Sequence, residues 1–261
     1  MEVKDHTMKS YFSFLLLSAL MVAGCSKSQP PQPKESAPAP VPQVVIDQAT
    51  AGSISGAVAF KGTAPAPRVL DMTQDPACPG GRQTAEAIVV KNGKLANAFV
   101  YVKEGLPAGT FPVPSEPAVL DQKGCRYVPH VLGIMAGQPL QVLNDDNAQH
   151  NVHPMPRVNA SWNESQPPHG QPIVKTFQKP ELMMAVQCNQ HPWMKMYLSV
   201  MQHPYFAVSG EDGSFEIRNL PPGEYTLVAV HEKLGEQTIK VKVDAKEKAR
   251  ADFLYASQQN H

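Results

Sequence analysis

Short runs with the alternation of a β-strand, separated by turn-forming residues, recur along most of this chain. Residues 53–60 (SISGAVAF), 98–102 (AFVYV) and 238–243 (TIKVKV) are examples. The sequence KNGK at 91–94 is a strong hairpin signal, because Asn-Gly accepts the positive φ angles of a tight turn. Almost no stretch shows helical periodicity, and 26 prolines accompany only 18% charged residues. We therefore expect an all-β, loop-rich protein.

The C-terminal run 212–230 (DGSFEIRNLPPGEYTLVAV) resembles the carboxypeptidase regulatory-like, or prealbumin-like, β-sandwich. That family usually opens with a G-x-V strand, a glycine turn and an A-x-V-x-V strand. In this chain the corresponding features lie far upstream, at 56–58, Gly62 and 98–102. The family's opening and its ending are thus separated by a long intervening segment.

This separation suggests one discontinuous prealbumin-like sandwich, formed by residues 52–116 and 203–256, with a second domain at 117–202 inserted between them. Insertion at a loop is physically cheap when the termini of the inserted domain lie close together. Three modules that follow one another along the chain are the alternative.

The inserted segment carries two groups of soft metal ligands. Strand-like residues 140–144 lead through an acidic loop to HNVH at 150–153, and residues 183–187 lead to CNQHPWMKM at 188–196. A thiolate with two imidazoles and a weak thioether suits copper that cycles between Cu(I) and Cu(II). Taken alone, the second run can also be a sulfur-rich piece of core.

Together these motifs resemble the cupredoxin family, and within it amicyanin. The resemblance rests on Gly-Gln-Pro before a strand that ends in Asn-Asp-Asp, on His-Asn-Val, and on Cys-x-x-His-x-x-Met. It implies a Greek-key β-sandwich with one mononuclear type 1 copper ion, held by His150, Cys188, His191 and Met194. Met196 is the alternative axial ligand, as in the longer loop of plastocyanin. Met194 is favoured because Met196 begins an alternating strand.

The expected function is that of a one-electron carrier with a protein redox partner. The outer ring edge of His191 is expected to emerge through an apolar patch of Pro192, Trp193 and Met194, where such a partner would dock. Copper delivery or storage is one alternative, and a surface binding module with a vestigial copper site is another. No catalytic triad, phosphate loop or supported carboxylate pair is present, so the sequence does not predict an enzyme.

Several other polar residues in the chain are expected to support the structure rather than bind copper. Asn144 and Asn151 are candidates to brace the two ligand loops. On a strand, His153 would point to the face opposite His150. Four further histidines are also expected to be structural or at the surface, namely His130, His169, His203 and His231.

The N-terminus has the pattern of an export signal. An apolar run follows Lys4 and Lys9, is too short to span a membrane, and ends in LMVAGC, which resembles the bacterial lipobox. We expect residues 1–25 to be a lipoprotein signal with lipid attached at Cys25. Residues 26–51 would form a Pro-rich tether, and the location would be the periplasmic side of a Gram-negative outer membrane. The net charge of zero argues against a nucleic-acid partner.

Four cysteines occur in the chain. If Cys25 carries lipid and Cys188 binds metal, Cys78 and Cys125 remain. An oxidising compartment favours a disulfide between them. Two separately buried thiols are the alternative, since the sequence contains no geometry that would decide.

Overall fold

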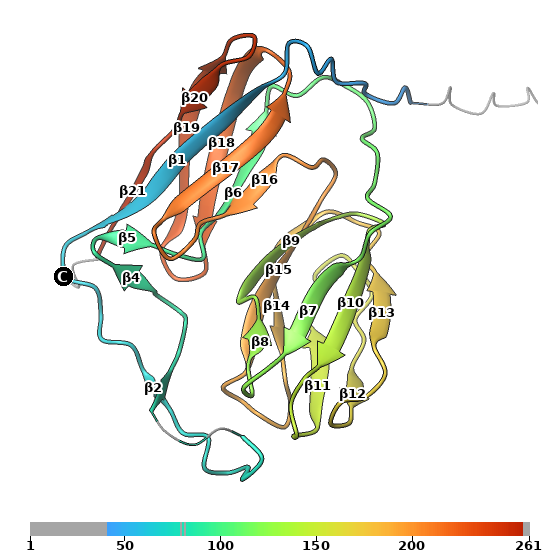
Figure 1. The fold of residues 1–261 in the computed structure, drawn as a ribbon, viewed down its shortest axis with the longest axis vertical. Coiled ribbons are helices and arrows are strands. Elements are labelled where there is room, and N and C mark those ends of the chain that lie inside the picture. The colour runs from blue at the N-terminus through green and yellow to red at the C-terminus, as the bar shows by residue number, and fades with distance from the viewer. Residues whose placement is uncertain (1–40, 79, 81, 258–261) are drawn as a thin grey trace, which may run out of the picture. The chain divides into compact units, whose positions relative to one another are not determined.

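The structure is a computed structural model that describes residues 41–78, 80 and 82–257. Every regular element in this part of the chain is a β-strand, which confirms the all-β class (Figure 1). Within these residues there is no helix of the length and apolarity needed to cross a membrane. The predicted signal, Cys25 and residues 26–40 of the predicted tether lie outside the described residues.

Two sheets form the first sandwich, and strands from both ends of the described chain share them (Figure 1). One sheet has the order β17 (Ser214–Leu220), β1 (Gly52–Lys61), β5 (Lys94–Leu95) and β4 (Val90–Lys91), with β20 (Lys248–Arg250) and β21 (Phe253–Ala256) also paired to β1. The other has the order β16 (Phe206–Val208), β6 (Phe99–Glu104), β18 (Gly223–His231) and β19 (Gly235–Val243).

Local sequence explains much of this first sandwich. Strand β1 has alternating burial, with Ile54 and Val58 fully enclosed in the core. The predicted hairpin at 91–94 joins β4 to β5, and Asn92 and Gly93 have φ angles of 52° and 70°. Positive φ at both central residues is what a type I′ turn requires, so the Asn-Gly prediction is confirmed.

The second sandwich is formed entirely by residues 118–201. One sheet has the order β13 (Ile173–Thr176), β10 (Pro139–Asn144), β7 (Ala118–Gln122) and β8 (Tyr127–Val128). The other has the order β12 (Glu164–Gln166), β11 (His150–Pro154), β14 (Glu181–Gln187), β15 (Lys195–Met201) and β9 (Val131–Met135). Their inward-facing side chains share one core, which includes Leu120, Leu140, Val152, Val186, Leu198 and Cys188.

Direct packing joins strands of the two sandwiches. A small buried cluster contains Phe99 and Val228 from the first together with Val131 and Met201 from the second. Gly133 of β9 makes this contact possible, because a Cβ there would lie 2.6 Å from the rings of Phe99 and Phe206. The contact is therefore a close approach that depends on glycine in the strand.

One more segment, 62–88, runs from the first sandwich to the second and contains the short pair β2 (Val69–Leu70) and β3 (Gln83–Thr84). Its Leu70 and Met72 pack in the core of the second sandwich. Cys78 and Cys125 form a disulfide with their Cα atoms 5.6 Å apart, which is the pairing predicted from the cysteine count. The segment is thereby attached beside the loop that carries Cys188 and His191.

Candidate metal centre

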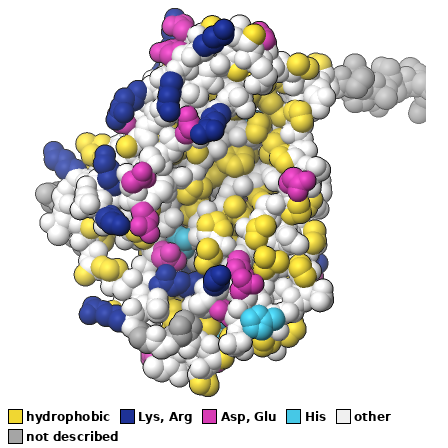
Figure 2. Space-filling view, viewed as in Figure 1, with side chains coloured by type: hydrophobic (Ala, Val, Ile, Leu, Met, Phe, Trp, Pro, Cys, Tyr) yellow, Lys and Arg dark blue, Asp and Glu magenta, His cyan; other side chains and the backbone are white. Residues whose placement is uncertain are grey.

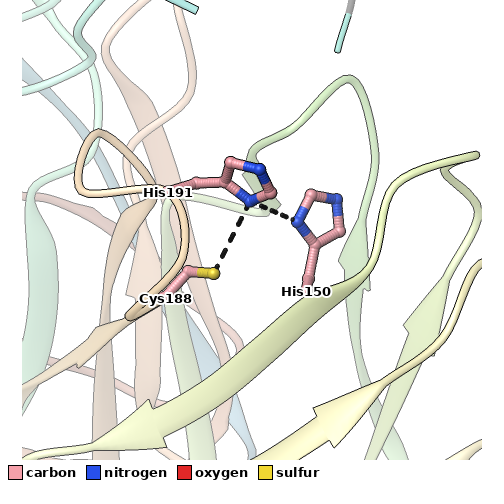
Figure 3. Close-up of side chains that lie close together, drawn as sticks. All are labelled: His150, Cys188 and His191. Atoms are coloured by element: carbon pink, nitrogen blue, oxygen red, sulfur yellow. Dashed lines mark hydrogen bonds between the residues drawn. The ribbon is translucent and has the colours of Figure 1, made fainter. Parts of the chain in front are cut away.

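Three side-chain atoms from two separate parts of the second sandwich converge in its interior (Figure 3). His150 Nδ1 lies 2.8 Å from His191 Nδ1, and Cys188 Sγ lies 3.7 Å from the same nitrogen. All three residues are buried, with exposed fractions of 0–3%. The structure thus brings together three of the four residues that the sequence predicted as copper ligands, with both Nδ1 atoms facing inward.

Strand ends determine where these side chains lie. His150 is the first residue of β11, and Cys188 directly follows the last residue of β14, which pairs with β11 in antiparallel register. A tight loop then returns the chain to β15. It is closed by hydrogen bonds from Met194 N–H to the His191 carbonyl (2.9 Å) and from Cys188 N–H to the Met194 carbonyl (3.2 Å). The loop therefore holds the Cys188 thiol and the His191 ring in a fixed relation.

Asn151 links the two ligand-bearing segments. Its backbone N–H donates to Cys188 Sγ at 3.5 Å, and its side-chain Oδ1 accepts from the Asn189 N–H at 2.7 Å. The thiol itself lies 3.2 Å from that Oδ1. Asn144 similarly braces the loop before His150 by donating to the Ala148 carbonyl, and it ties that loop to the segment after β12 by donating to the Pro167 carbonyl. Both asparagines have the bracing contacts expected from the sequence.

The two methionines occupy different kinds of backbone. Met194 lies in the closed loop and is 1% exposed. Met196 lies within β15, opposite Val186, and is fully buried in the core. This placement of Met196 in a strand agrees with the reason for which Met194 was favoured as the axial ligand.

The outer ring nitrogen of His150 is paired with a carboxylate. His150 Nε2 lies 2.9 Å from Asp146 Oδ2, and the same carboxylate accepts from the N–H groups of Gly124 (2.6 Å) and Cys125 (2.7 Å). Burial lowers the pKa of His150 despite this carboxylate, so the ring favours the neutral form that metals bind. Asp146 thereby orients the ring with Nδ1 toward the thiol.

The outer ring nitrogen of His191 is covered in the same way, which overturns one expectation from the sequence. We expected this ring edge to emerge through an apolar patch, but His191 is only 3% exposed and its Nε2 lies 3.0 Å from Asp75 Oδ2. The cause is the 62–88 segment, which the Cys78 disulfide holds over the ring. A hydrogen bond from the Ala77 N–H, followed by that with His191, lowers the pKa of Asp75.

Sequence reasoning did not identify Asp75 or Asp146. Asp146 had a usable signal, since it lies in the acidic loop four residues before His150. Asp75 had none, because 116 residues separate it from His191. Among the described residues, the other histidines have partners of their own outside the centre. These are Glu232 for His130, Asn189 for His153, Asn147 for His169, the Tyr205 N–H for His203 and the Lys233 N–H for His231.

The donor set fits a copper ion. Two imidazoles and one thiol in a buried position offer the soft N₂S set of copper electron-transfer sites, and a harder cation would prefer oxygen ligands. Each imidazole has a carboxylate at its outer nitrogen, which orients the ring. His150, Cys188 and His191 would hold the ion, and the copper would supply a one-electron cycle.

Comparison with known proteins yields partial matches. A family model for the β-sandwich domain of ER membrane protein complex subunit 7 matches residues 187–261. A reduced form of an amicyanin mutant is 23% identical over 34% of this chain and 85% of its own, with a TM-score of 0.30. A purple cupredoxin from Nitrosopumilus maritimus is 20% identical over 32% of this chain and 98% of its own, with a TM-score of 0.28.

A copper-containing nitrite reductase from Thermus scotoductus SA-01 is 23% identical over 37% of this chain, with a TM-score of 0.29, but the match spans only 25% of the reductase. No curated protein matches this chain. At such TM-scores these likenesses carry no argument about the function of the chain. The case for a metal rests on the geometry of the centre.

Proposed function

We propose that His150, Cys188 and His191 bind a single type 1 copper ion, with Met194 as a weak axial ligand, and that the protein carries one electron at a time. The observation that supports this most is the convergence of two Nδ1 atoms and one Sγ in a buried position. Such a site is held by two paired strands and a closed loop. Little rearrangement is then needed between Cu(I) and Cu(II), which favours fast electron transfer.

The setting of this function is also proposed. Residues 1–25 would export the chain, Cys25 would anchor it by lipid to the outer membrane of a Gram-negative bacterium, and the tether to residue 51 would hold it off the bilayer. The copper domain, 117–202, would be inserted in a prealbumin-like sandwich that serves as a spacer or docking surface. The pairing of β1 with β17, β20 and β21 supports a single discontinuous sandwich.

Colour tests the proposal directly. Full-length protein loaded with Cu(II) should absorb strongly in the visible range through a transition from the Cys188 thiolate to copper, and Cys188→Ser should abolish the band. Met194→Leu should shift the band and raise the reduction potential, whereas Met196→Leu serves as the matched control and should leave both unchanged. A colourless Cu(II) form of the unmodified protein would contradict the proposal.

Copper storage or delivery is a second candidate, because the covered edge of His191 removes the contact through which a partner protein was expected to exchange electrons. Two rates distinguish the candidates. A carrier should exchange electrons with a soluble cytochrome c within seconds and yield Cu(I) slowly to a chelator such as bathocuproine disulfonate. A storage or delivery protein should exchange electrons slowly with cytochrome c and yield Cu(I) rapidly to the chelator.

A further inference from the structure

A cavity of about 430 Å³ lies beside the ligand loop, and the proposed electron-carrier function makes no use of it. Trp193 and Met194 of that loop form part of its wall, and the 62–88 segment contributes further lining residues such as Leu70 and Ile88. Its volume falls within the range of roughly 300–1,000 Å³ that small-molecule sites occupy. The cavity is therefore large enough for a compact organic molecule.

Three aromatic side chains form part of the wall of this cavity. Trp193 is half-buried, and its Nε1–H donates to the Cys125 carbonyl at 3.1 Å, which holds the indole in one orientation. The indole centroid lies 5.0 Å from that of His191. Tyr127 and Tyr197 complete the wall, and burial, with Glu232 beside it, raises the pKa of Tyr197 to about 12. A planar ring suits such a wall better than a flexible chain does.

The charged groups around the cavity are unbalanced. Four cationic side chains line it against two carboxylates, and these are Arg68, Arg126, Lys195 and Lys233 against Glu86 and Glu232. On the face drawn in Figure 2, most of the basic side chains lie toward the left and top, and hydrophobic side chains gather in the middle and toward the right. The lining therefore has a net positive charge, with His130 as an additional titratable group.

The two carboxylates already have partners. Glu86 lies 3.5 Å from the Arg126 guanidinium, and Glu232 is shared by His130 (2.7 Å) and Lys233 (3.6 Å). Arg68 and Lys195 are exposed and have no carboxylate within 4.0 Å among the described residues. The buried Arg126 Nε also has no hydrogen-bond partner within the described part of the chain. The unsatisfied groups are thus donors and cations, which is what an anionic ligand complements.

We propose that this cavity is a binding site for a small aromatic carboxylate, whose ring would lie against Trp193 and Tyr197 and whose carboxylate would pair with Lys195 and Arg68. The site does not depend on copper, since none of its binding groups is a proposed metal ligand except Met194, which contributes only apolar wall. Its occupant would nevertheless lie one indole ring away from His191. Ligand binding and copper binding would then be linked reciprocally through the shared loop.

Fluorescence of the metal-free full-length protein tests the proposal. The chain has two tryptophans, so a Trp162→Phe variant makes Trp193 the single reporter. The probes are 4-hydroxybenzoate and its uncharged amide, 4-hydroxybenzamide, which share the same ring. We expect 4-hydroxybenzoate to quench the fluorescence of Trp193 in a saturable way. It should bind about ten-fold more tightly than the amide, because one charge-assisted hydrogen bond contributes about that factor to affinity.

A matched pair of lysine variants then locates the charge. Lys195→Gln should lower the affinity for 4-hydroxybenzoate about five- to ten-fold and leave the affinity for the amide unchanged. Lys103→Gln, at an exposed position outside the cavity, should change neither affinity. Equal affinity for the carboxylate and the amide would overturn the proposal, and so would an unchanged affinity in Lys195→Gln. Because no copper is present, these results are independent of the colour test above.

Discussion

The outer ring nitrogens of His150 and His191 make the same kind of contact, but the residues that provide the contact come from different parts of the chain. Both Nε2 atoms lie about 3 Å from an aspartate oxygen, at 2.9 Å for His150 and 3.0 Å for His191. The aspartate of His150 comes from its own loop, and the aspartate of His191 comes from a segment 116 residues away. The same orienting contact can therefore arise from local sequence or from tertiary packing alone.

A single covalent bond connects the two arrangements. Cys78 donates its backbone N–H to the Asp75 carbonyl at 3.1 Å, and Cys125 donates its N–H to Asp146 Oδ2 at 2.7 Å. The disulfide between them lies against both carboxylate–histidine pairs, because each sulfur lies within 4.8 Å of a carboxylate oxygen and a histidine nitrogen. Only the His191 side, however, should depend on this bond, since Asp146 shares a loop with His150.

Loss of the disulfide should have the largest effect, and it should loosen the Asp75–His191 contact while the Asp146–His150 contact stays in place. The double variant Cys78→Ser, Cys125→Ser opens a link across 47 residues, which costs about 4 kcal/mol of unfolding free energy in the chain-entropy description. Urea denaturation measures this loss. Amide exchange should increase over residues 71–78 and stay slow over 144–152. An equal increase in amide exchange over both stretches would contradict this expectation, because it would show that Asp146 depends on the disulfide as much as Asp75 does.

Asp146→Asn should have the next largest effect. The amide nitrogen cannot accept a hydrogen bond, so one of the N–H groups of Gly124, Cys125 or the His150 ring loses its acceptor. We expect Cu(II) affinity to fall about 100-fold, with lower stability of the metal-free protein. Competition with a chelator measures the affinity. Asp145→Asn, at the exposed neighbouring position, is the control and should bind copper normally.

Asp75→Asn should weaken Cu(II) binding about ten-fold, because Asp75 contacts His191 but braces fewer backbone groups than Asp146 does. Removal of a negative charge beside the site should also raise the reduction potential, since that charge stabilises Cu(II) more than Cu(I). Voltammetry checks the direction. Asp71→Asn, in the same segment but bonded to Thr73, should leave the potential unchanged. An unchanged potential in Asp75→Asn would remove Asp75 from any role at the centre.

His153→Gln should have the smallest effect. His153 lies three residues after His150 on β11, and its Nδ1 contacts Asn189 Oδ1 at 3.2 Å, away from the thiol. We expect copper affinity to change by less than about two-fold and stability by less than about 0.5 kcal/mol. Chelator competition and thermal unfolding measure both. A large loss of affinity would mean that the ligand set differs from the one proposed.

Sequence reasoning succeeded for the strands, the turns and the closely spaced residues Cys188 and His191, but it missed Asp146 despite a local signal. The Asn-Gly hairpin follows from the φ angles that two residues accept, and the all-β class follows from alternation within single strands. Cys188 and His191 lie three residues apart, so a single loop places them near each other. For His150 the prediction needed a family resemblance, because nothing local indicates which distant strand lies beside that loop.

By itself, then, the sequence determined the strand-rich class and the turns, since these depend on side-chain identity and short-range backbone preference. The set of copper ligands was a prediction that also drew on a family resemblance. Only the tertiary structure decided that Asp75 covers His191, that Gly133 lets the two sandwiches touch and that a cationic cavity adjoins Trp193. The physical reason is that packing brings together residues from distant parts of the chain. Their proximity is set by the shapes of whole sheets and by one disulfide, and no local pattern records it.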